Sequence, residues 1–470
     1  MTTRAALGID LGTSGVKVAL LSEGGTVLGS VARAYDVVSP HAGWAEIDPL
    51  TWQQATGDAV RAVLESTPHT DVVGIGLDGQ MHGVVLVDQD GQPTRPAVLW
   101  PDGRAVSQAD RLSQLGPESL ASLANPVTPG MAGPMLAWLA ENEADVVQGS
   151  SSFVLPKDWV RSLLTGWRPA TDPSDASATL LWDVATDDWA TTVAGASGVP
   201  TRLFPTVHAS ADASGDTGAT ARTWGLRTHV PVSFGCSDVA ATLLGLEAEP
   251  GRTMITIGTG AQVVLPGVAP EKSFPPSHHL YRDAGDGWYA MVAVTNAGLA
   301  LQRVLTLLNA DWDELYAPYE RAGEIPGFLP FFTGERLPVR LSGGQAGWFD
   351  VGLSAGREHL LAAALEGVAF AIRHAVDVMP SASTEIDLAG GGTRSPVFAQ
   401  LLADVLGRPL RRVPNRDATV VGAARLGWKA AGLEAPSTGS APDEIIEPCT
   451  SPQLEARYAR FINALTTRLG

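Results

Sequence analysis

The five residues Ile9-Asp10-Leu11-Gly12-Thr13 decide the fold, because they recur as Ile255-Thr256-Ile257-Gly258-Thr259. The two copies lie 246 residues apart (258 minus 12), which is about half of the 470-residue chain. Each copy ends an apolar, strand-like run, and a second apolar run follows it. A repeat in the same local context indicates two similar domains. We place their boundary near residues 245–251, which gives domains 1–245 and 246–470.

Strands and helices alternate on both sides of this boundary. The first half predicts strands at 5–10, 15–21, 26–32 and 72–77, with a helix from the Asp48-Pro49 pair to residue 64. The second half predicts strands at 288–294 and 386–389, and helices at 297–308, 359–379, 395–406 and 419–431. Such alternation is typical of the α/β class.

Composition excludes several classes of protein. The net charge of −18 disfavours a nucleic-acid partner, because phosphate backbones need a basic face. No uninterrupted apolar run reaches about 18 residues, so we expect no membrane span. Asp10 and Lys17 interrupt the N-terminal apolar run, so we expect no signal peptide and a cytoplasmic protein. Two cysteines are too few for a disulfide framework or a thiolate zinc site.

The two Gly-Thr loops are candidate phosphate sites. Backbone N–H groups and a hydroxyl at a strand end suit an anionic oxygen, and glycine allows a close approach. Hairpin turns are the alternative, but two equivalent copies favour phosphate binding by Gly12-Thr13-Ser14 and Gly258-Thr259. Asp10 ends the strand before the first loop, where a carboxylate beside phosphates suits Mg²⁺. Capping of a turn is its other common role.

A glycine run marks a third candidate site. Gly390-Gly391-Gly392-Thr393 follows a predicted strand and precedes a helix capped by Ser395. Backbone can approach a nucleotide closely there, and a helix N-terminus favours negative charge. A tight turn would use the same residues, so the run by itself is weak evidence for binding.

Two further segments carry candidate chemistry. Asp238 stands among small residues at a predicted strand-to-helix junction, where a carboxylate can accept a proton from an attacking hydroxyl. Spacing alone favours an N-cap over a catalytic base. Gln80-Met81-His82 follows the strand at 72–77, and polar groups at a strand end suit a hydroxyl-rich ligand. A lone histidine is more often structural.

Together these segments resemble the FGGY family of carbohydrate kinases, within the actin, Hsp70 and sugar-kinase superfamily. The resemblance covers nearly the whole chain. Besides the loops above, it rests on Gly43–Pro49, Leu155-Pro-Lys-Asp158, Thr171–Ser177, Phe328–Arg336, Gly390–Ser395 and Gly422-Ala-Ala424. As an ordered set these motifs are highly specific.

The resemblance implies two ribonuclease-H-like domains around a central cleft, with the sugar mainly on the first domain and ATP mainly on the second, and with Mg²⁺ as the metal. It makes Asp238 the expected general base and Asp10 the expected metal partner. Nucleotide contacts are expected from Gly12, Thr13, Ser14, Gly258, Thr259, Gly391, Gly392 and Thr393. Sugar contacts are expected from Gln80, Met81, His82, Trp100, Asp102 and Asp238.

The same resemblance bears on the substrate. Met-His after Gln80 is similar to kinases of D-xylulose, whereas glycerol kinases have Arg-Glu, so we expect D-xylulose to be converted to D-xylulose 5-phosphate. Pro101 and Val239 stand where asparagine is usual, and the second loop reads Gly-Thr-Gly-Ala. Another ketose or a polyol (ribulose, erythrulose, a pentitol or tetritol) therefore stays open, as does an actin-like or Hsp70-like ATPase. The sequence does not settle the oligomeric state; a homodimer is one arrangement that it allows.

Overall fold

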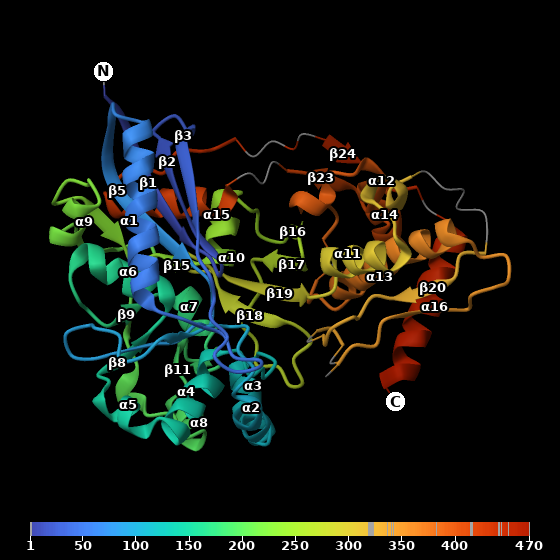
Figure 1. The fold of residues 1–470 in the computed structure, drawn as a ribbon, viewed down its shortest axis with the longest axis horizontal. Helices are drawn as coiled ribbons and strands as arrows, with labels where there is room; N and C mark the ends of the chain where they lie inside the picture. The colour runs from blue at the N-terminus through green and yellow to red at the C-terminus, as the bar shows by residue number, and fades with distance from the viewer. Residues whose placement is uncertain are drawn as a thin grey trace.

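The computed structural model describes residues 2–469 except 318–323, 336, 340, 342, 382, 414–416, 440, 441, 443 and 450. Arg336, the last residue of the Phe328–Arg336 motif, lies outside the described residues. The chain forms two lobes, each built on a mixed sheet with helices against it (Figure 1). The predicted α/β class is confirmed.

The first sheet has seven strands, in the order β13-β14-β5-β1-β2-β3 with β15 also paired to β5. Its strands are β1 (Thr3–Leu11), β2 (Gly15–Ser22), β3 (Val27–Ala34), β5 (Thr70–Gly79), β13 (Ala213–Asp216), β14 (Pro231–Ser233) and β15 (Cys236–Ser237). Neighbours run antiparallel from β1 to β3, whereas β5 runs parallel to β1 and to β14.

The second sheet also has seven strands, in the order β18-β19-β17-β16-β22-β23-β24. They are β16 (Thr253–Ile257), β17 (Ala261–Pro266), β18 (His279–Arg282), β19 (Trp288–Val294), β22 (Ile386–Ala389), β23 (Leu410–Arg412) and β24 (Glu444–Ile446). From β16 the neighbours run antiparallel to β17 and β19 and parallel to β22 and β23, as in the first sheet. The repeat read from the sequence is therefore a repeat of topology.

Five helices of the two sheet domains begin and end close to the predicted positions: α1 (Pro49–Ser66), α11 (Gly298–Leu308), α13 (Arg357–Asp377), α14 (Pro396–Leu406) and α15 (Ala418–Ala430). The structure adds α10 (Asp238–Gly245), α12 (Trp312–Leu315) and α16 (Pro452–Leu469). The Asp48 side chain accepts a hydrogen bond from Leu50 N and Pro49 opens α1, as the sequence predicted. The second core packs around α13.

Residues between β5 and β14 form smaller elements that extend the first lobe downward in Figure 1. Its helices are α2 (Val106–Leu112), α3 (Pro117–Leu123), α4 (Ala132–Asn142), α5 (Ala144–Gly149), α6 (Pro156–Thr165), α7 (Pro173–Ser177), α8 (Thr191–Ala196) and α9 (Ala219–Thr223). Short strand pairs connect them: β4 (Glu46–Ile47) with β7 (Ala97–Val98), β6 (Val85–Val87) with β8 (Ser152–Val154), β9 (Ala170–Thr171) with β12 (Thr206–Val207), and β10 (Trp182–Asp183) with β11 (Asp188–Trp189). The remaining pair, β20 (Gly327–Leu329) with β21 (Gly347–Phe349), belongs to the second lobe.

One helix, α13, has the length and apolar character of a membrane span. In its most apolar window 78% of the residues are buried inside the protein, where they form the second core. A core helix of a globular domain passes the same test, so α13 is weak evidence for a membrane. Both cysteines, Cys236 and Cys449, are free thiols.

The helix α15 crosses from the second half of the chain onto the first sheet. It packs on β1 and β5 and against α10 (Figure 1). Glycines make this approach possible: a Cβ atom on Gly422 would lie 1.9 Å from the Ala241 carbonyl oxygen, and one on Gly76 would lie 1.8 Å from that of Ala423. A division of the chain at residue 245 therefore separates the sheets but not all the helices.

We expect Gly422→Ala to destabilise the protein. The added Cβ would overlap the Ala241 backbone in α10, and overpacking of this kind costs about 1–3 kcal/mol. The matched control is Gly195→Ala in α8, where no atom lies within 4 Å of the new Cβ and a small gain in helix propensity is expected. Thermal and urea denaturation of the two variants check this. Equal midpoints for both would show that the helix contact tolerates a methyl group.

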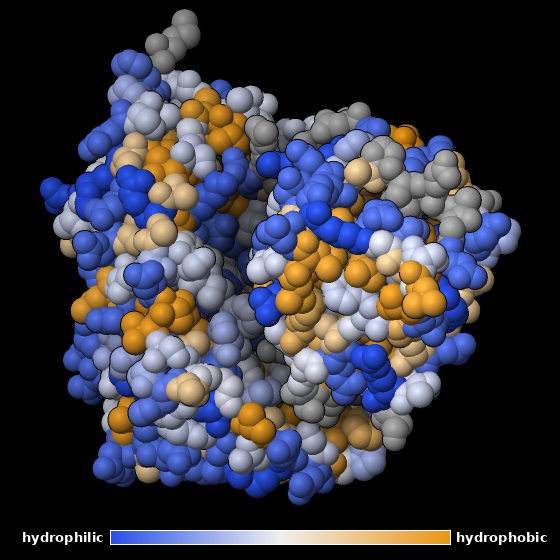
Figure 2. Space-filling view, turned by 45° about the vertical axis from the view of Figure 1, so that its right-hand side comes forward, coloured by the Kyte–Doolittle hydropathy of each residue, from blue (hydrophilic) through white to orange (hydrophobic). Residues whose placement is uncertain are grey.

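The surface is divided by a deep groove between the two lobes (Figure 2). The helices α10 and α15 link the lobes behind it, since they pack on each other and on the first sheet. Strand ends of both sheets carry the candidate site residues.

Candidate active site

Three carboxylates meet where β1, β5 and β15 end. Asp10 on β1 is the register partner of Asp78 on β5, and Cys236 on β15 pairs with Asp78 from the other side. Asp238 follows β15 directly and is the first residue of α10. Sequence reasoning predicted Asp10 and Asp238 but missed Asp78, whose only local signal is its place next to Gly79 and Gln80 at a strand end.

Burial in this cluster raises the pKa of all three carboxyls. Desolvation brings the pKa of Asp10 to about 6, against the lowering effects of Asp78 and Lys17. Desolvation and the neighbouring Asp10 carboxylate raise the pKa of Asp238 to about 7. Desolvation, followed by the charges of Asp10 and Asp238, raises the pKa of Asp78 well above its usual range. Carboxyls with strongly raised pKa values in a groove are candidates for proton transfer.

The carboxylates also fit a hard divalent cation. Both oxygens of Asp78 are buried and have no hydrogen-bond partner among the described residues, and Asp10 lies beside them. Within the same described ranges, no three His, Cys, Asp or Glu side chains converge closely enough to hold a metal ion by themselves. Mg²⁺ takes one or two protein carboxylates and completes its shell with phosphate oxygens and water, so the donor set suits it.

The first glycine loop is a hairpin turn that also faces open space. Gly12 N donates to Gly15 O at 3.0 Å, which closes the turn between β1 and β2. A hollow of about 260 Å³ is lined by Gly12, Thr13 and Ser14. Trp100 Nε1 donates to Thr13 Oγ1 at 2.9 Å, and Gln80 Nε2 donates to Gly12 O at 3.3 Å. The first glycine loop is thus both a hairpin turn and an exposed loop. It contacts Gln80 of the predicted sugar segment, Gln80-Met81-His82.

The second glycine loop lines a cavity of about 490 Å³ together with the glycine run. Gly258, Thr259, Gly391 and Gly392 all contribute to its wall, as the sequence predicted of residues that share one ligand. Sequence reasoning missed the rest of the wall, which includes Gly298, Gln302, Trp312, Tyr316 and Phe398. A cavity with glycine backbone at one end and aromatic rings at the other suits a phosphorylated, planar molecule.

The aromatic part of this cavity comes from distant segments. Trp312 and Tyr316 stack with ring centroids 5.7 Å apart, and Tyr316 lies 6.5 Å from Phe398 of α14. Trp312 is 39% exposed and lines the cavity with Tyr316 and Phe398. These three aromatic residues come together only because the α12 region lies beside α14 in the folded protein.

Two residues predicted to contact ligands use their side chains within the protein. Thr393 is 3% exposed, is not among the residues that line the cavity, and donates its hydroxyl to Gly390 O at 2.7 Å, which stabilises the glycine turn. Asp102 is 1% exposed, and its carboxylate accepts hydrogen bonds from Ala45 N and from Arg104. Asp102 thereby orders the loop that carries Trp100, and the ligand contacts of both residues stay predictions.

The sugar segment sits at the meeting of the two lobes. Met81 and Val239 are buried in one apolar cluster with Tyr281 and Tyr289 of the second sheet. His82 has a φ of 72°, and its Nδ1 lies 2.7 Å from Ala178 O. A positive φ at a non-glycine residue is strained and is commonest at functional sites. Sequence reasoning missed Tyr281, whose ring centroid lies 6.1 Å from that of His82.

The chain matches known proteins along almost its whole length. Residues 5–245 match the N-terminal domain, and residues 253–431 the C-terminal domain, of the FGGY family of carbohydrate kinases. The xylulose kinase of Escherichia coli strain K12 is 32% identical over 466 residues, covering 97% of this chain and 96% of that protein. The xylulose kinase of Klebsiella pneumoniae is 33% identical over 444 residues, covering 92% and 91%.

Solved structures agree with these matches. A xyloylose kinase from Brucella ovis superposes with a TM-score of 0.90 at 31% identity, covering 98% of each chain. A gluconate kinase from Lactobacillus acidophilus gives a TM-score of 0.91 at 18% identity, covering 99% of this chain and 97% of that one. At such low identity the second match shows a shared fold and nothing about the sugar.

Proposed function

Because the chain belongs to the FGGY family of carbohydrate kinases, we propose that it transfers the γ-phosphoryl group of ATP to D-xylulose, giving D-xylulose 5-phosphate. The observation that carries this proposal is the position of Asp238. Its carboxylate lies with Asp10 and Asp78 at the strand ends beside the first glycine loop, and its neighbour Val239 packs with Met81 of the sugar segment. The family assignment decides against an actin-like or Hsp70-like ATPase.

In the proposed reaction Asp238 accepts the proton of the sugar hydroxyl that attacks the γ-phosphorus. A positioned base of raised pKa is suited to this role near neutral pH. The cavity next to Gly258 would take the nucleotide. The rings of Trp312 and Tyr316 would lie beside its adenine ring, and glycine backbone would lie beside its phosphates. The loop at Gly12–Ser14 would meet the terminal phosphate from the other lobe.

Asp10 and Asp78 would hold Mg²⁺ in this proposal, because both Asp78 oxygens lack a hydrogen-bond partner among the described residues and Asp10 is the register partner of Asp78. When bound, Mg²⁺ neutralises negative charge on the phosphates. The location that fits such an enzyme is the cytoplasm, where its cosubstrate is found.

A second candidate substrate class follows from the apolar side chain of Val239, next to the proposed base. Val239 is 4% exposed and its side chain offers no hydrogen bond, where the family resemblance leads us to expect an asparagine with two donors and an acceptor. A site built to bind a hydroxyl rejects an analogue lacking it by about 10⁴-fold, whereas an apolar wall discriminates weakly. Ketoses or polyols other than D-xylulose are therefore candidates.

We expect wild-type protein to phosphorylate several ketoses with similar kcat/KM, and Val239→Asn to narrow that range. The measurement is ADP release coupled to a reporter enzyme, with D-xylulose, D-ribulose, erythrulose, deoxy analogues, and C4 and C5 polyols. Val230→Asn, at a buried position of the first core outside the sugar segment, controls for the cost of burying an amide. If wild type strongly prefers D-xylulose and Val239→Asn does not change that preference, the wider substrate range is refuted and D-xylulose remains the proposed substrate. ADP release that no sugar stimulates would refute the proposed function.

A further inference from the structure

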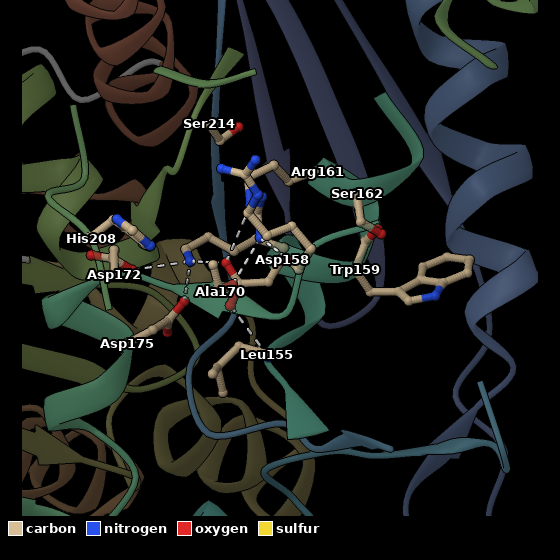
Figure 3. Close-up of polar contacts among 12 residues, drawn as sticks. Leu155, Asp158, Trp159, Arg161, Ser162, Ala170, Asp172, Asp175, His208 and Ser214 are labelled. Carbon is tan, nitrogen blue, oxygen red and sulfur yellow. Dashed lines mark hydrogen bonds and ion pairs between the residues drawn. The ribbon is translucent and has the colours of Figure 1, made fainter. Parts of the chain in front are cut away.

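A buried group of charged side chains lies directly beneath the active site and takes no part in the proposed chemistry. Lys157 Nζ, on α6, lies 2.7 Å from Asp158 Oδ1, 3.0 Å from Asp172 Oδ1 and 3.1 Å from Asp175 Oδ2. All four side chains are inaccessible to solvent. Figure 3 shows Asp158 of α6 near Asp175 of α7 and Asp172, the N-cap of α7, with Arg161 above them. We call Lys157, Asp158, Asp172 and Asp175 the Lys157 cluster.

The Lys157 cluster touches the floor of the site. A Cβ atom on Gly79, at the end of β5, would lie 3.1 Å from Lys157 Cβ, so the lysine stem packs under the strand that carries Asp78. Burial of charged groups is costly even when they are paired, and removing one partner costs more. A buried cluster of this kind can fix the orientation of its side chains. The contacts of Asp172 show such a fixed orientation.

Asp172 is held on both of its oxygens. Oδ1 faces Lys157, and Oδ2 accepts hydrogen bonds from Ser174 N at 2.9 Å, Ser174 Oγ at 2.6 Å and Ser210 Oγ at 2.8 Å. The carboxylate therefore sets the hydroxyl rotamer of Ser174. A hydroxyl has one hydrogen to donate, and that of Ser174 is committed to Asp172.

The lone pairs of Ser174 Oγ are thereby directed at the backbone before Asp238. Ser237 N donates to Ser174 Oγ at 2.8 Å. Ser237 is the N-cap residue of α10, and its side chain makes no capping hydrogen bond to this helix. Asp238 in turn accepts a hydrogen bond at Oδ1 from Val239 N at 2.8 Å, so its carboxylate follows the backbone of the first turn. A continuous chain of contacts runs from Lys157 through Asp172 and Ser174 to the residue before the base.

We propose that Ser174 is a positioning residue for Asp238, oriented by Asp172 and Lys157, and that it fixes the start of α10. The proposal rests on the proposed function, in which Asp238 is the general base. Small misplacements of a reacting group cost up to about 10²-fold in rate, and partners behind a site typically contribute 10- to 100-fold. The Ser174 side chain is inaccessible to solvent, so in this proposal its loss acts on turnover and not on binding.

The chain offers a matched control. Ser210 donates to the same oxygen of Asp172 from a buried hydroxyl, but Ser237 N donates to Ser174 and not to Ser210. Ser174→Ala and Ser210→Ala therefore remove equivalent hydrogen bonds from one carboxylate, and only the first removes the acceptor of Ser237 N. We expect kcat with D-xylulose, or with the sugar that wild type phosphorylates fastest, to fall about 10- to 100-fold in Ser174→Ala, with KM for sugar and ATP within about 3-fold. Ser210→Ala should keep more than half of the wild-type kcat.

A second measurement needs no substrate. Hydrogen–deuterium exchange of the ligand-free proteins should show faster exchange at the Ser237 amide in Ser174→Ala and unchanged exchange in Ser210→Ala. The proposal is overturned if both variants lose kcat equally, if Ser174→Ala keeps more than half of kcat, or if exchange at Ser237 does not change. If wild type phosphorylates no sugar, the proposed function fails by itself, and the exchange experiment still decides whether Ser174 holds Ser237.

Discussion

Asp238→Asn is expected to lower kcat about 10²- to 10⁴-fold, because it removes a positioned base while keeping the size of the side chain. Binding of sugar and ATP should persist, since the amide fills the same space, and sugar-induced changes in tryptophan fluorescence measure that binding. A variant that keeps more than half of the wild-type kcat would remove Asp238 from this role.

The raised pKa of Asp238 makes the same variant informative about stability. In the folded protein the pKa is about 7, above the ordinary aspartate value of 3.8, so the folded state favours the protonated form. The ionised carboxylate therefore costs stability increasingly as pH rises from about 4 to 7, and the full cost is present above 7. Asp238→Asn should melt at a higher temperature than wild type at pH 8 and at the same temperature near pH 4. The wild-type kcat/KM should rise across pH 6–8, because the base is the ionised form.

Removal of divalent metal is expected to abolish turnover, and Asp10→Asn to raise the Mg²⁺ concentration needed for half-maximal activity by about 10-fold or more. The charge on the transferring phosphoryl group must be neutralised. Asp78 has two oxygens without a hydrogen-bond partner among the described residues, and Asp10 is its register partner. Titration of activity with Mg²⁺ in both proteins is the measurement. The control is Asp58→Asn on α1, a half-exposed carboxylate that pairs with Arg61.

Two outcomes would contradict the metal prediction. Full activity in excess chelator would show that the reaction needs no divalent cation. An unchanged Mg²⁺ requirement in Asp10→Asn, with lowered kcat, would place Asp10 among the groups that orient the phosphates and not among the metal partners.

Several features were predictable because they depend on neighbours in the sequence. Strand runs, the Asp48-Pro49 helix start and the turns after Leu11 and Ile257 follow from local periodicity and backbone chemistry. The repeat at Gly12 and Gly258 needed only comparison of the chain with itself, and it revealed the shared topology of the two sheets. The domain boundary near residue 245 is still a prediction.

Other features exist only through pairing of distant segments. Asp78 becomes part of the site because β5 lies between β1 and β15, and the aromatic wall of the cavity needs α12 beside α14. Asp102 and Thr393 have side chains suited to ligands, but the fold gives their polar atoms to the scaffold.

The sequence by itself determined the α/β class, the repeat and the glycine loops, since each depends on local runs of residues, and it offered Asp238 as a candidate base through the family resemblance. The tertiary structure decided which polar groups are satisfied by protein and which are left for ligands. It also decided that α15 packs on the sheet of the other half and that Ser174 meets Ser237. The physical reason is that burial and hydrogen-bond satisfaction depend on what the rest of the chain places around a residue, and residue type and spacing do not specify those neighbours.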